Sequence, residues 1–485
     1  MSIYDYRWSA PHQNDRAEKN LIIFIKKYLA KYNPYYKELF ELKQIDVTKF
    51  KSSEDIQSIP ITNKQDHVSD PLKFIMKPYM PDWWECNFPT EPLTNLDLFK
   101  YRLRTLNKTY FREIFSKDGM TNDEKLIAEA SIDWLPAHFH NTGSSTDPML
   151  IAYSQRDLQK NIPEISAHMF LMGFKPNWEV FNLMPASPSI NFFQSVWMPL
   201  TIGGGTFFSC GEEVTPISTQ INLANKITFE VFIGTPSYVT YWLTKAIEEL
   251  NKGYINSISS IKKCILAGEP LTDEYKKQIK GLFETLGSQP ELIENYANNR
   301  TKVSFVECQE GAGIHLNPRY FFWEVLDQKT NQVVEEGKSG YLCFSHIDWR
   351  GTTFLRYNTG DLIQGLEWKK CEKCGLIMPI IKGPIVRAQD EFIKIKRKSI
   401  SKTSLNDCIR STKGVNLYQI IISSNKIDIF VNISEDQKES STKEIFGKIT
   451  ALTGISPTVV LESKEEINTR IFSRGILKAE LIIEK

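Results

Sequence analysis

The sequence predicts an α/β fold in two domains, a large multi-sheet N-terminal domain and a small α+β C-terminal domain. Between residues 153 and 296, helical stretches alternate with short apolar runs, which is the pattern of strands connected by helices. After residue 390 the pattern changes to shorter runs with more basic residues. A chain of 485 residues is also longer than one hydrophobic core usually holds. We therefore expect domains over residues 1–389 and 390–485.

The first part of the large domain is predicted to be helical. Residues 1–130 contain helical stretches broken by proline-rich loops, and the helical periodicity of residues 21–32 ends at Asn33 and Pro34. Five apolar runs in the following region are expected to be strands: residues 180–184, 205–209, 231–234, 263–267 and 292–296. Residues 340–345 and 354–362 are expected to form further strands.

The small domain is predicted from short runs that follow one another closely. Residues 392–398 alternate, residues 417–423 and 426–433 resemble a hairpin, residues 443–452 are helical, and the chain ends near the apolar run 481–483. These elements are enough for a compact domain, because domains of about 95 residues are common.

Composition and charge exclude several classes of protein. With 41% hydrophobic and 24% charged residues, the chain resembles an ordinary globular protein rather than a disordered or collagen-like one. A net charge of +1 creates no field that would hold nucleic acid or anionic lipid. The first residues carry charges, and no segment reaches about 18 uninterrupted apolar residues. We expect a soluble cytoplasmic protein that binds neither nucleic acid nor a membrane.

A string of small hydroxyl residues follows the apolar segment that ends at residue 139, and it contains Gly143, Ser144 and Ser145. Glycine lets backbone N–H groups approach phosphate oxygens, and the hydroxyls add donors. The string is therefore a candidate phosphate-binding loop. An ordinary turn between two strands is the alternative interpretation.

Three further motifs occur in a specific order along the chain. Gly268, Glu269 and Pro270 follow one apolar run, Tyr296 ends another, and Asp361 lies near the end of a predicted strand. The order and spacing of these motifs resemble the adenylate-forming superfamily of acyl-CoA synthetases, most closely its phenylacetate-CoA ligase branch. The resemblance extends from residue 35 to the C-terminus, so it covers most of the chain.

The resemblance implies a large α/β domain and a small mobile domain that rotates between two half-reactions. In such enzymes ATP and a carboxylate give an acyl-adenylate, which a thiol then attacks. The family's roles imply that Gly268, Glu269 and Pro270 line the adenine pocket, that Tyr296 stacks on the adenine ring, and that Asp361 accepts hydrogen bonds from the ribose hydroxyls.

Arg356 lies on the predicted strand that leads into Asp361. The resemblance makes it a candidate for holding that carboxylate in place at the nucleotide site. A plain surface salt bridge is the alternative.

Two of the family's motifs have lost residues that serve phosphoryl chemistry. Thr146 and Asp147 stand where the phosphate loop has a glycine and a lysine, and a carboxylate beside a triphosphate repels it. Arg300 stands where the family has a glutamate that ligates magnesium. A guanidinium cannot ligate a cation.

A further departure concerns the family's catalytic lysine near the C-terminus, which bridges the carboxylate and the α-phosphate. Ile476 stands in its place. On a strand, Lys478 and Arg474 would share the face of Ile476, so these two cations are the candidate catalytic substitutes. One electrostatic contact to a developing charge is worth about 3 kcal/mol, so the loss of several would lower the reaction rate by many powers of ten.

The last constellation is Cys308, His315, Cys371 and Cys374. Cys371 and Cys374 form a Cys-x2-Cys knuckle, which points two thiolates at one ion. A site of three cysteines and one histidine predicts a structural zinc ion, since four protein ligands leave no open position for water. Free thiols and a surface histidine are the alternative.

His138 and His140 precede the glycine-serine string. The resemblance implies that one of them lines the acyl pocket, and a role of His140 as a catalytic general base is the alternative. The aromatic residues whose presence indicates a flat or apolar acyl group are Phe139, Phe192, Phe193 and Trp197.

Three functions are compatible with these residues. We favour transfer of an acyl or aryl group between coenzyme A and the thiol of an acyl carrier protein, without ATP, because the departures fall on positions that serve phosphoryl chemistry. An ATP- and magnesium-dependent carboxylate:CoA ligase that releases AMP is the first alternative. A non-catalytic scaffold with a nucleotide pocket is the second. On the favoured hypothesis the small domain pivots near Asp390 and rests in the orientation for thioester formation.

Overall fold

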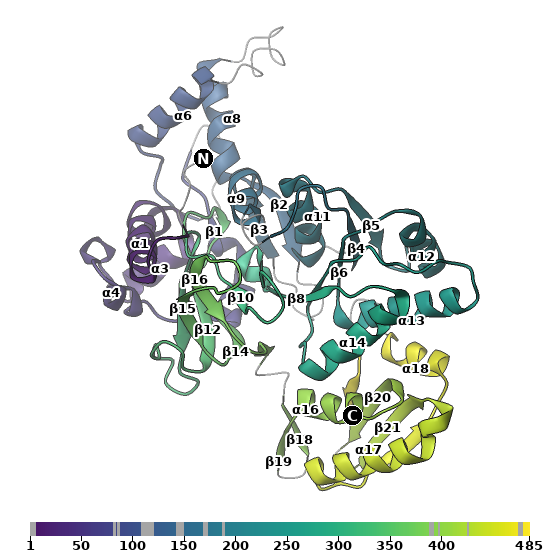
Figure 1. The fold of residues 1–485 in the computed structure, drawn as a ribbon. Coiled ribbons are helices and arrows are strands. Elements are labelled where there is room, and N and C mark those ends of the chain that lie inside the picture. The colour runs from purple at the N-terminus through teal and green to yellow at the C-terminus, as the bar shows by residue number, and fades with distance from the viewer. Residues whose placement is uncertain are drawn as a thin grey trace.

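The computed structural model describes residues 6–80, 84, 88–107, 121–141, 150–167, 173–186, 190–387, 392–395, 398–423, 426–473 and 479–485. Figure 1 shows N-terminal helices at one end of the molecule and sheets in its centre. The C-terminal part of the chain lies beside helices α13 (Pro236–Asn251) and α14 (Asp273–Leu286) (Figure 1).

The N-terminal part of the chain is helical, as predicted. Helical residues run without a break from α1 (Ala10–Phe24) through the π-helix η1 (Ile25–Leu29) to α2 (Ala30–Tyr32). The run ends where expected, because Asn33 caps α3 (Pro34–Leu42) by accepting a hydrogen bond from the backbone N–H of Tyr36 at 3.2 Å. The elements that follow are η2 (Val47–Lys49), α4 (Ser53–Gln57), α5 (Lys64–Ser69), η3 (Pro71–Phe74), α6 (Asn95–Asn107) and α8 (Asn122–Trp134). None of the helices described is long and apolar enough to span a membrane.

A six-stranded sheet forms the centre of the larger part of the molecule. Its order is β5 (Thr206–Cys210), β4 (Val180–Pro185), β6 (Val231–Gly234), β7 (Lys263–Ala267), β8 (Glu291–Ala297) and β9 (Ser304–Val306). The first five of these strands are parallel, and β9 is antiparallel to β8. The five apolar runs predicted as strands are confirmed.

Side chains of this sheet alternate between two cores, one on each face. Phe232 and Leu266 pack in the core that includes α12 (Ile217–Lys226), α13 and α14. Their neighbours Ile233 and Ile265 belong to a second core with Trp178. The elements near the second face are η4 (Asp157–Asn161), α9 (Ile162–Ser166) and α11 (Ile190–Ile202).

Smaller antiparallel units complete the larger part. They are β11 (Phe321–Leu326), β12 (Gly340–His346), β14 (Tyr357–Ile363) and β17 (Val386–Arg387) in one sheet, β10 (Ile314–His315), β16 (Ile377–Ile381) and β15 (Leu366–Lys370) in a second, and the pairs β2 (Pro136–Asn141) with β3 (Leu150–Ser154) and β1 (Ile75–Met76) with β13 (Gly351–Thr352). The strand predicted over residues 354–362 begins only at Tyr357, because Arg356 has a φ of +43° and interrupts the extended conformation.

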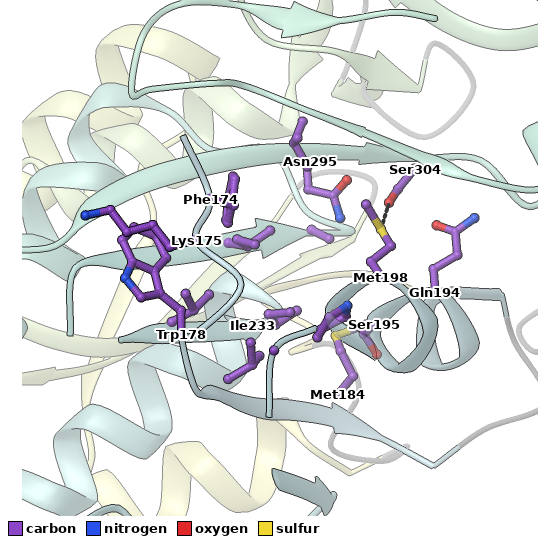
Figure 2. Close-up of a pocket in the computed structure, with 17 residues that line it drawn as sticks. Phe174, Lys175, Trp178, Met184, Gln194, Ser195, Met198, Ile233, Asn295 and Ser304 are labelled. Carbon is purple, nitrogen blue, oxygen red and sulfur yellow. Dashed lines mark hydrogen bonds between the residues drawn. The ribbon is translucent and has the colours of Figure 1, made fainter. Parts of the chain in front are cut away.

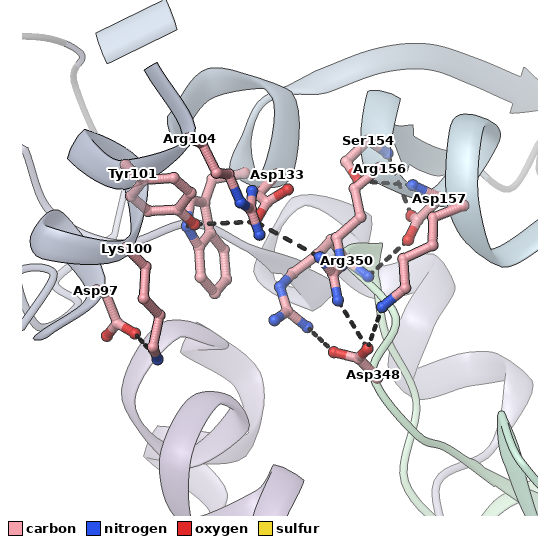
Figure 3. A network of polar contacts seen from close by, with 12 residues as sticks. Asp97, Lys100, Tyr101, Arg104, Asp133, Ser154, Arg156, Asp157, Asp348 and Arg350 are labelled. Carbon is pink, nitrogen blue, oxygen red and sulfur yellow. Dashed lines mark hydrogen bonds and ion pairs between the residues drawn. The ribbon is translucent and has the colours of Figure 1, made fainter. Parts of the chain in front are cut away.

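A polar network joins α6 and α8 to the loop before β13 (Figure 3). Asp133, near the end of α8, accepts hydrogen bonds from Tyr101 at 3.0 Å and from Arg104 at 3.1 Å. Arg156 donates to Asp348 at 2.7 Å. Both carboxylates are thus paired within the network, which holds the N-terminal helices against the rest of the large part.

The C-terminal part of the chain has a sheet and a core of its own. The sheet order is β22 (Thr458–Leu461), β21 (Lys426–Ile433), β20 (Val415–Ser423) and β23 (Ile482–Glu484). The other elements are β18 (Phe392–Ile395), β19 (Lys398–Ser401), α16 (Lys402–Arg410), η6 (Glu435–Gln437), α17 (Lys438–Thr453) and α18 (Lys464–Ile471). Strands β20 and β21 form the predicted hairpin, and isoleucines such as Ile420 and Ile429 fill the core. The predicted boundary between residues 389 and 390 lies outside the described residues and stays a prediction.

Candidate active site and metal cluster

The structure brings together Tyr296 and Asp361, two of the predicted nucleotide-binding residues. Tyr296 lies on β8 and Asp361 on β14, and the tyrosine hydroxyl donates to Asp361 Oδ2 at 2.7 Å. Asn298 Nδ2 donates to the same oxygen at 3.2 Å, and Arg387 Nε donates to Oδ1 at 3.2 Å. Three donors therefore hold a carboxylate that is 5% exposed.

Burial and the neighbouring Asp361 carboxylate raise the pKa of Tyr296 well above its usual value. The phenol therefore stays protonated and remains a hydrogen-bond donor. Its ring is 8% exposed, and its role of stacking on adenine stays a prediction.

The described hydrogen bonds of Arg356 go to residues other than Asp361. Its Nε donates to Glu324 at 3.1 Å, and its NH1 group donates to the carbonyl oxygens of Gln57 at 2.7 Å and Ile59 at 2.8 Å. None of its described hydrogen bonds reaches Asp361. The surface salt bridge that was the alternative is instead a buried one, with both side chains at most 5% exposed.

Asn298 and Arg387 are site residues that the sequence interpretation missed. Asn298 follows Tyr296 by two positions, so it lies on the same side of the chain there and could have been found from that spacing. Arg387 reaches Asp361 because β17 pairs with β14 with these two residues directly opposite each other. That pairing cannot be read from a local pattern.

Gly268, Glu269 and Pro270 follow β7, and Gly268 has a φ of +86°, which suits glycine. The Glu269 carboxylate accepts hydrogen bonds from the backbone N–H of Ser237 at 3.0 Å and from the Ser237 hydroxyl. Ser237 lies at the start of α13. The predicted adenine segment is therefore tied to the amino-terminal turn of that helix.

The C-terminal part of the chain contacts this same region. The backbone N–H of Ala479 donates to Ser237 Oγ at 3.2 Å. Arg474 and Lys478, the candidate catalytic cations, lie in residues 474–478, outside the described residues. Ala479 directly follows Lys478, so the described chain resumes beside Ser237 and its partner Glu269.

Further contacts hold the two parts together along α14 and α13. Thr272 donates to Asp407 at 2.7 Å, and the Arg410 guanidinium lies 3.6 Å from the centroid of the Tyr275 ring. The rings of Tyr241 and Phe472 also meet, with 5.4 Å between centroids.

The candidate phosphate loop lies outside the described residues, which include Asn141 and Leu150 on either side of it. Gly143, Ser144, Ser145, Thr146 and Asp147 are therefore not placed. The loop connects β2 and β3, which pair through Asn141 and Leu150. The pairing of these two strands is compatible with a phosphate-binding loop and with an ordinary turn between them.

His140, the candidate general base, is a buried residue of β2. It is 2% exposed, and its ring packs edge-on against His138 and Tyr153, with centroids 4.4 and 4.8 Å apart. Neither histidine is among the described residues that line the large cavity.

Arg300, at the position of the family's magnesium ligand, is buried near the nucleotide residues. It is 4% exposed, and its guanidinium lies 4.9 Å from the centroid of the Tyr357 ring. Burial lowers the pKa of this guanidinium from its usual value. Arginine still stays charged at neutral pH, so a fixed positive charge occupies this position.

A cavity of about 690 Å³, counting its open mouth, lies on the second face of the central sheet (Figure 2). Its lining is largely apolar and comes from β4, β6, β7, β8, β9 and α11. Asn295 lines the cavity, while Tyr296, the next residue of β8, points to the opposite face. Strand β8 therefore separates the cavity from the Asp361 site.

The aromatic residues of the cavity differ from those expected. Phe174 and Trp178 line it, whereas Phe139 and Trp197 are not among the described lining residues. The side chains of Phe192 and Phe193 lie outside the described ones. Phe174 and Trp178 lie in a loop before β4 that carries no motif, so composition alone could not have identified them.

The four predicted metal ligands come together, with their ligand atoms all within 4.8 Å of one another. Cys308 Sγ lies 3.7 Å from Cys371 Sγ, and Cys374 Sγ lies 3.4 Å from His315 Nε2. These residues come from the chain after β9, from β10 and from the turn between β15 and β16. Segments that are distant in the sequence thus meet at one cluster.

Backbone groups orient the ligands of this cluster. His315 Nδ1 lies 2.8 Å from the carbonyl oxygen of Gly313, which leaves Nε2 facing the cysteines. The backbone N–H of Lys373 donates to Cys371 Sγ at 3.4 Å. A hydrogen bond from Cys308 and the nearby His315 lower the pKa of the Cys374 thiol to about 4. Cys374 therefore favours the thiolate, the form that binds metal, whereas the hydrogen bond to Cys374 and burial raise the pKa of the Cys308 thiol.

Comparisons with known proteins support the resemblance given by the motifs. A phenylacetate-coenzyme A ligase of Thermus thermophilus is 26% identical over 306 residues, which is 61% of this chain and 65% of that protein. A phenylacetate-coenzyme A ligase of Pseudomonas putida is 22% identical over 257 residues, 50% of this chain and 56% of that protein. The matched region thus spans less than two thirds of the length of either relative. No family model matches the chain.

Solved structures show the same fold. A 2-hydroxyisobutyryl-CoA ligase in its postadenylation state with 2-HIB-AMP is 16% identical, with a TM-score of 0.74 over 98% of this chain and 90% of that one. The same enzyme in its thioesterification state, with 2-HIB-AMP and CoA, gives a TM-score of 0.59 at 16% identity over 99% of this chain and 91% of that one. The fold is that of the adenylate-forming enzymes, and the resemblance to their phenylacetate-CoA ligase branch is confirmed.

The C-terminal part contacts the region around α13 and α14 through Ala479, Asp407 and Arg410. The expectation that this part rests in the thioester orientation stays a prediction.

Proposed function

We propose that the protein is an ATP-dependent carboxylate:CoA ligase. The observation that carries the proposal is the position of the C-terminal part, whose Ala479 contacts Ser237 beside Glu269. A protein that only moved acyl groups between thiols would have no need for an arrangement that closes beside the predicted adenine segment. The ligase therefore replaces acyl transfer as the favoured function.

In the proposed reaction an acid and ATP meet on the two sides of β8. A carboxylate oxygen of the acid forms a bond to the α-phosphorus of ATP, and the bond to pyrophosphate breaks. The sulfur of CoA then attacks the carbonyl carbon, loses its proton, and AMP leaves. The cavity would hold the acyl group, and Tyr296, Asp361 and Arg387 would hold the nucleotide.

The charges of this site would replace those that the family's motifs have lost. Arg300 carries a buried positive charge near the nucleotide residues and would offset part of the charge on the phosphates. Lys478 or Arg474 would supply the cation that bridges the carboxylate and the α-phosphate. Magnesium bound by ATP itself remains compatible with this assignment.

We also propose that the cluster of Cys308, His315, Cys371 and Cys374 holds a structural zinc ion. Tetrahedral zinc with Zn–S bonds of about 2.3 Å requires sulfur atoms about 3.8 Å apart. The separation between Cys308 Sγ and Cys371 Sγ is 3.7 Å, which fits that geometry. Four protein ligands would leave no position for a reacting water.

Pyrophosphate exchange tests the ligase. The purified full chain is incubated with ATP, magnesium, labelled pyrophosphate and a panel of aryl and branched carboxylic acids, and thioester formation is followed by mass spectrometry after CoA is added. We expect acid-dependent exchange followed by acyl-CoA. Absence of exchange with every acid, at a protein concentration equal to that of the nucleotide, would contradict the proposal.

Acyl transfer to a carrier-protein thiol is the second candidate, and Arg300 favours it because a guanidinium cannot ligate magnesium. The protein would then take the acyl group from acyl-CoA without ATP. Intact mass of a carrier protein incubated with acyl-CoA and this chain measures that activity. Transfer without ATP, together with absent exchange, would favour the second candidate over the ligase.

A further inference from the structure

We propose that the acid carries a hydroxyl or amino group close to its carboxylate and an otherwise apolar body. This inference rests on the proposed function, in which the large cavity holds the acyl group. The cavity has two chemically different ends, and it is the polar end that lies nearest the predicted nucleotide site.

The register of the parallel strands identifies the two ends. Ala267 ends β7 and Asn295 lies near the end of β8, and both line the cavity. The next residues along the chain are Gly268 and Tyr296, which belong to the predicted nucleotide site. The carboxyl ends of parallel strands meet at one edge of a sheet, so this end of the cavity adjoins that site.

The opposite end is mainly apolar, with Lys175 as a charged residue of its lining. Val180 and Val231 are the first residues of β4 and β6, and they line the cavity together with Phe174 and Trp178. Figure 2 shows Phe174, Lys175 and Trp178 on one side of the cavity, and Asn295, Ser304, Gln194 and Ser195 on the other. An aromatic or branched hydrocarbon body fits the apolar end.

Two amides at the polar end have buried atoms without a hydrogen-bond partner in the described part of the chain. Gln194 on α11 is 4% exposed, and in the described part of the chain neither its Oε1 nor its Nε2 has a hydrogen-bond partner. Asn295 Oδ1 is likewise buried without a partner among the described residues. Ser195 differs, because its Oγ accepts a hydrogen bond from Asn182 at 2.8 Å.

Buried amides without partners are rare in folded proteins because each costs free energy. A ligand that pairs with them recovers that cost, which indicates that the ligand has complementary groups. Gln194 offers both a donor and an acceptor, and Asn295 Oδ1 is an acceptor. The ionised carboxylate of the acid has no donor, so it cannot satisfy Asn295 Oδ1.

A hydroxyl group can pair with either residue. Its hydrogen can be donated to Asn295 Oδ1 or to Gln194 Oε1, and its oxygen can accept from Gln194 Nε2. An amino group can donate to either amide oxygen. Because the polar end adjoins the nucleotide site, this group lies close to the reacting carboxylate, as in a 2-hydroxy acid or an ortho-hydroxy or ortho-amino aryl acid.

Calorimetry with matched acids tests the inference on the full chain without ATP or CoA. The pairs are 2-hydroxybenzoate against benzoate and 2-hydroxyphenylacetate against phenylacetate. We expect at least one hydroxylated acid to bind about 100-fold more tightly than its partner. Gln194→Leu should reduce that preference to within about threefold by weakening only the hydroxylated acid. Gln65→Leu, an exposed site, is the matched control and should retain the preference.

Equal or tighter binding of the unsubstituted acids would overturn the inference, and so would the absence of binding by every acid. Thioester formation tests the ligase proposal separately. Preferential binding of hydroxylated acids without any thioester would contradict the ligase proposal and support the inference about the acid. Thioester formation only from unsubstituted acids would support the ligase proposal and contradict the inference.

Discussion

The two faces of strand β8 are built differently. On one face, which we call the nucleotide face, the Asp361 carboxylate is held by Tyr296, Asn298 and Arg387. The other face, which we call the cavity face, carries Asn295. There, Asn295 Oδ1 and the amide of Gln194 are buried without partners among the described residues. The first arrangement is organised without a ligand, whereas on our proposal a ligand would supply the missing hydrogen bonds of the second. Variants that act on one face alone can test this difference.

The largest expected effect comes from the cluster of Cys308, His315, Cys371 and Cys374, the proposed zinc site, which lies beside the cavity. Cys308 and Cys371 pack in the same core as Met184 and Val306, which line the cavity. Cys374→Ser should lower the melting temperature by about 10 °C or more, because the ion would staple segments that are distant in the chain. Differential scanning calorimetry measures the change, and elemental analysis of the unmodified protein should find about one equivalent of zinc.

Cys408→Ser is the matched control, because Cys408 is a partly buried thiol of α16 outside the cluster. It should leave the zinc content unchanged. Less than about half an equivalent of zinc in protein purified without chelator, with an unchanged melting temperature for Cys374→Ser, would contradict the zinc site.

The next largest effect is expected for the cation that would bridge the carboxylate and the α-phosphate. Either Lys478→Ala or Arg474→Ala should lower the rate of pyrophosphate exchange by about 100-fold or more, because a charge that meets developing negative charge is worth about 3 kcal/mol. The other variant should change the rate much less. Lys443→Ala on α17, an exposed lysine, is the control. Unchanged rates for both variants would exclude both residues from the role.

Asp361→Asn should act on the nucleotide face and leave the cavity face unchanged. The KM for ATP should rise by about 10- to 100-fold, because hydrogen bonds to a charged group are worth about 1.5–3 kcal/mol. Tyr296→Phe removes one of the donors to Asp361 and should shift the KM in the same direction by less. Acid affinity measured by calorimetry should stay within about twofold in both variants. Asp15→Asn on α1 is the exposed control.

A loss of acid affinity as large as the change in KM would show that the two faces of β8 do not act independently. That result would contradict the difference between the two faces, but it would not contradict the ligase proposal.

The smallest expected effect concerns stability and pH. Burial, together with the nearby Glu307 carboxylate, raises the pKa of Glu294 on β8 to about 7. Between pH 4.5 and 7 the folded state therefore holds a proton that the unfolded state releases, so this group lowers stability as the pH rises through that range. Glu294→Gln should stabilise the protein at pH 8 by about 1 kcal/mol and have little effect near pH 4.5. Thermal melting at the two pH values measures this, and a variant less stable than the unmodified protein at pH 8 would contradict it.

The strands of the central sheet, and the grouping of Cys308, His315, Cys371 and Cys374, could be predicted from the sequence alone. The strands could be predicted because buried parallel strands are short, nearly continuous apolar runs, such as residues 231–234 and 263–267. The cluster could be predicted because the spacing of Cys371 and Cys374 is itself a local geometry that faces one ion. Tyr296 and Asp361 were found because their motifs are local as well.

The hydrogen-bond partners of the polar side chains could be found only from the folded chain. Arg356 is close to Asp361 in the sequence, yet it pairs with Glu324, while Arg387 reaches Asp361 through the pairing of β14 with β17. Gln194 carries no motif, and its burial beside the cavity depends on how α11 packs on the sheet. The orientation of the C-terminal part depends on contacts between surfaces that are far apart in the chain. Local patterns report the backbone and the apolar face of each element, whereas hydrogen-bond partners and cavities depend on which elements meet.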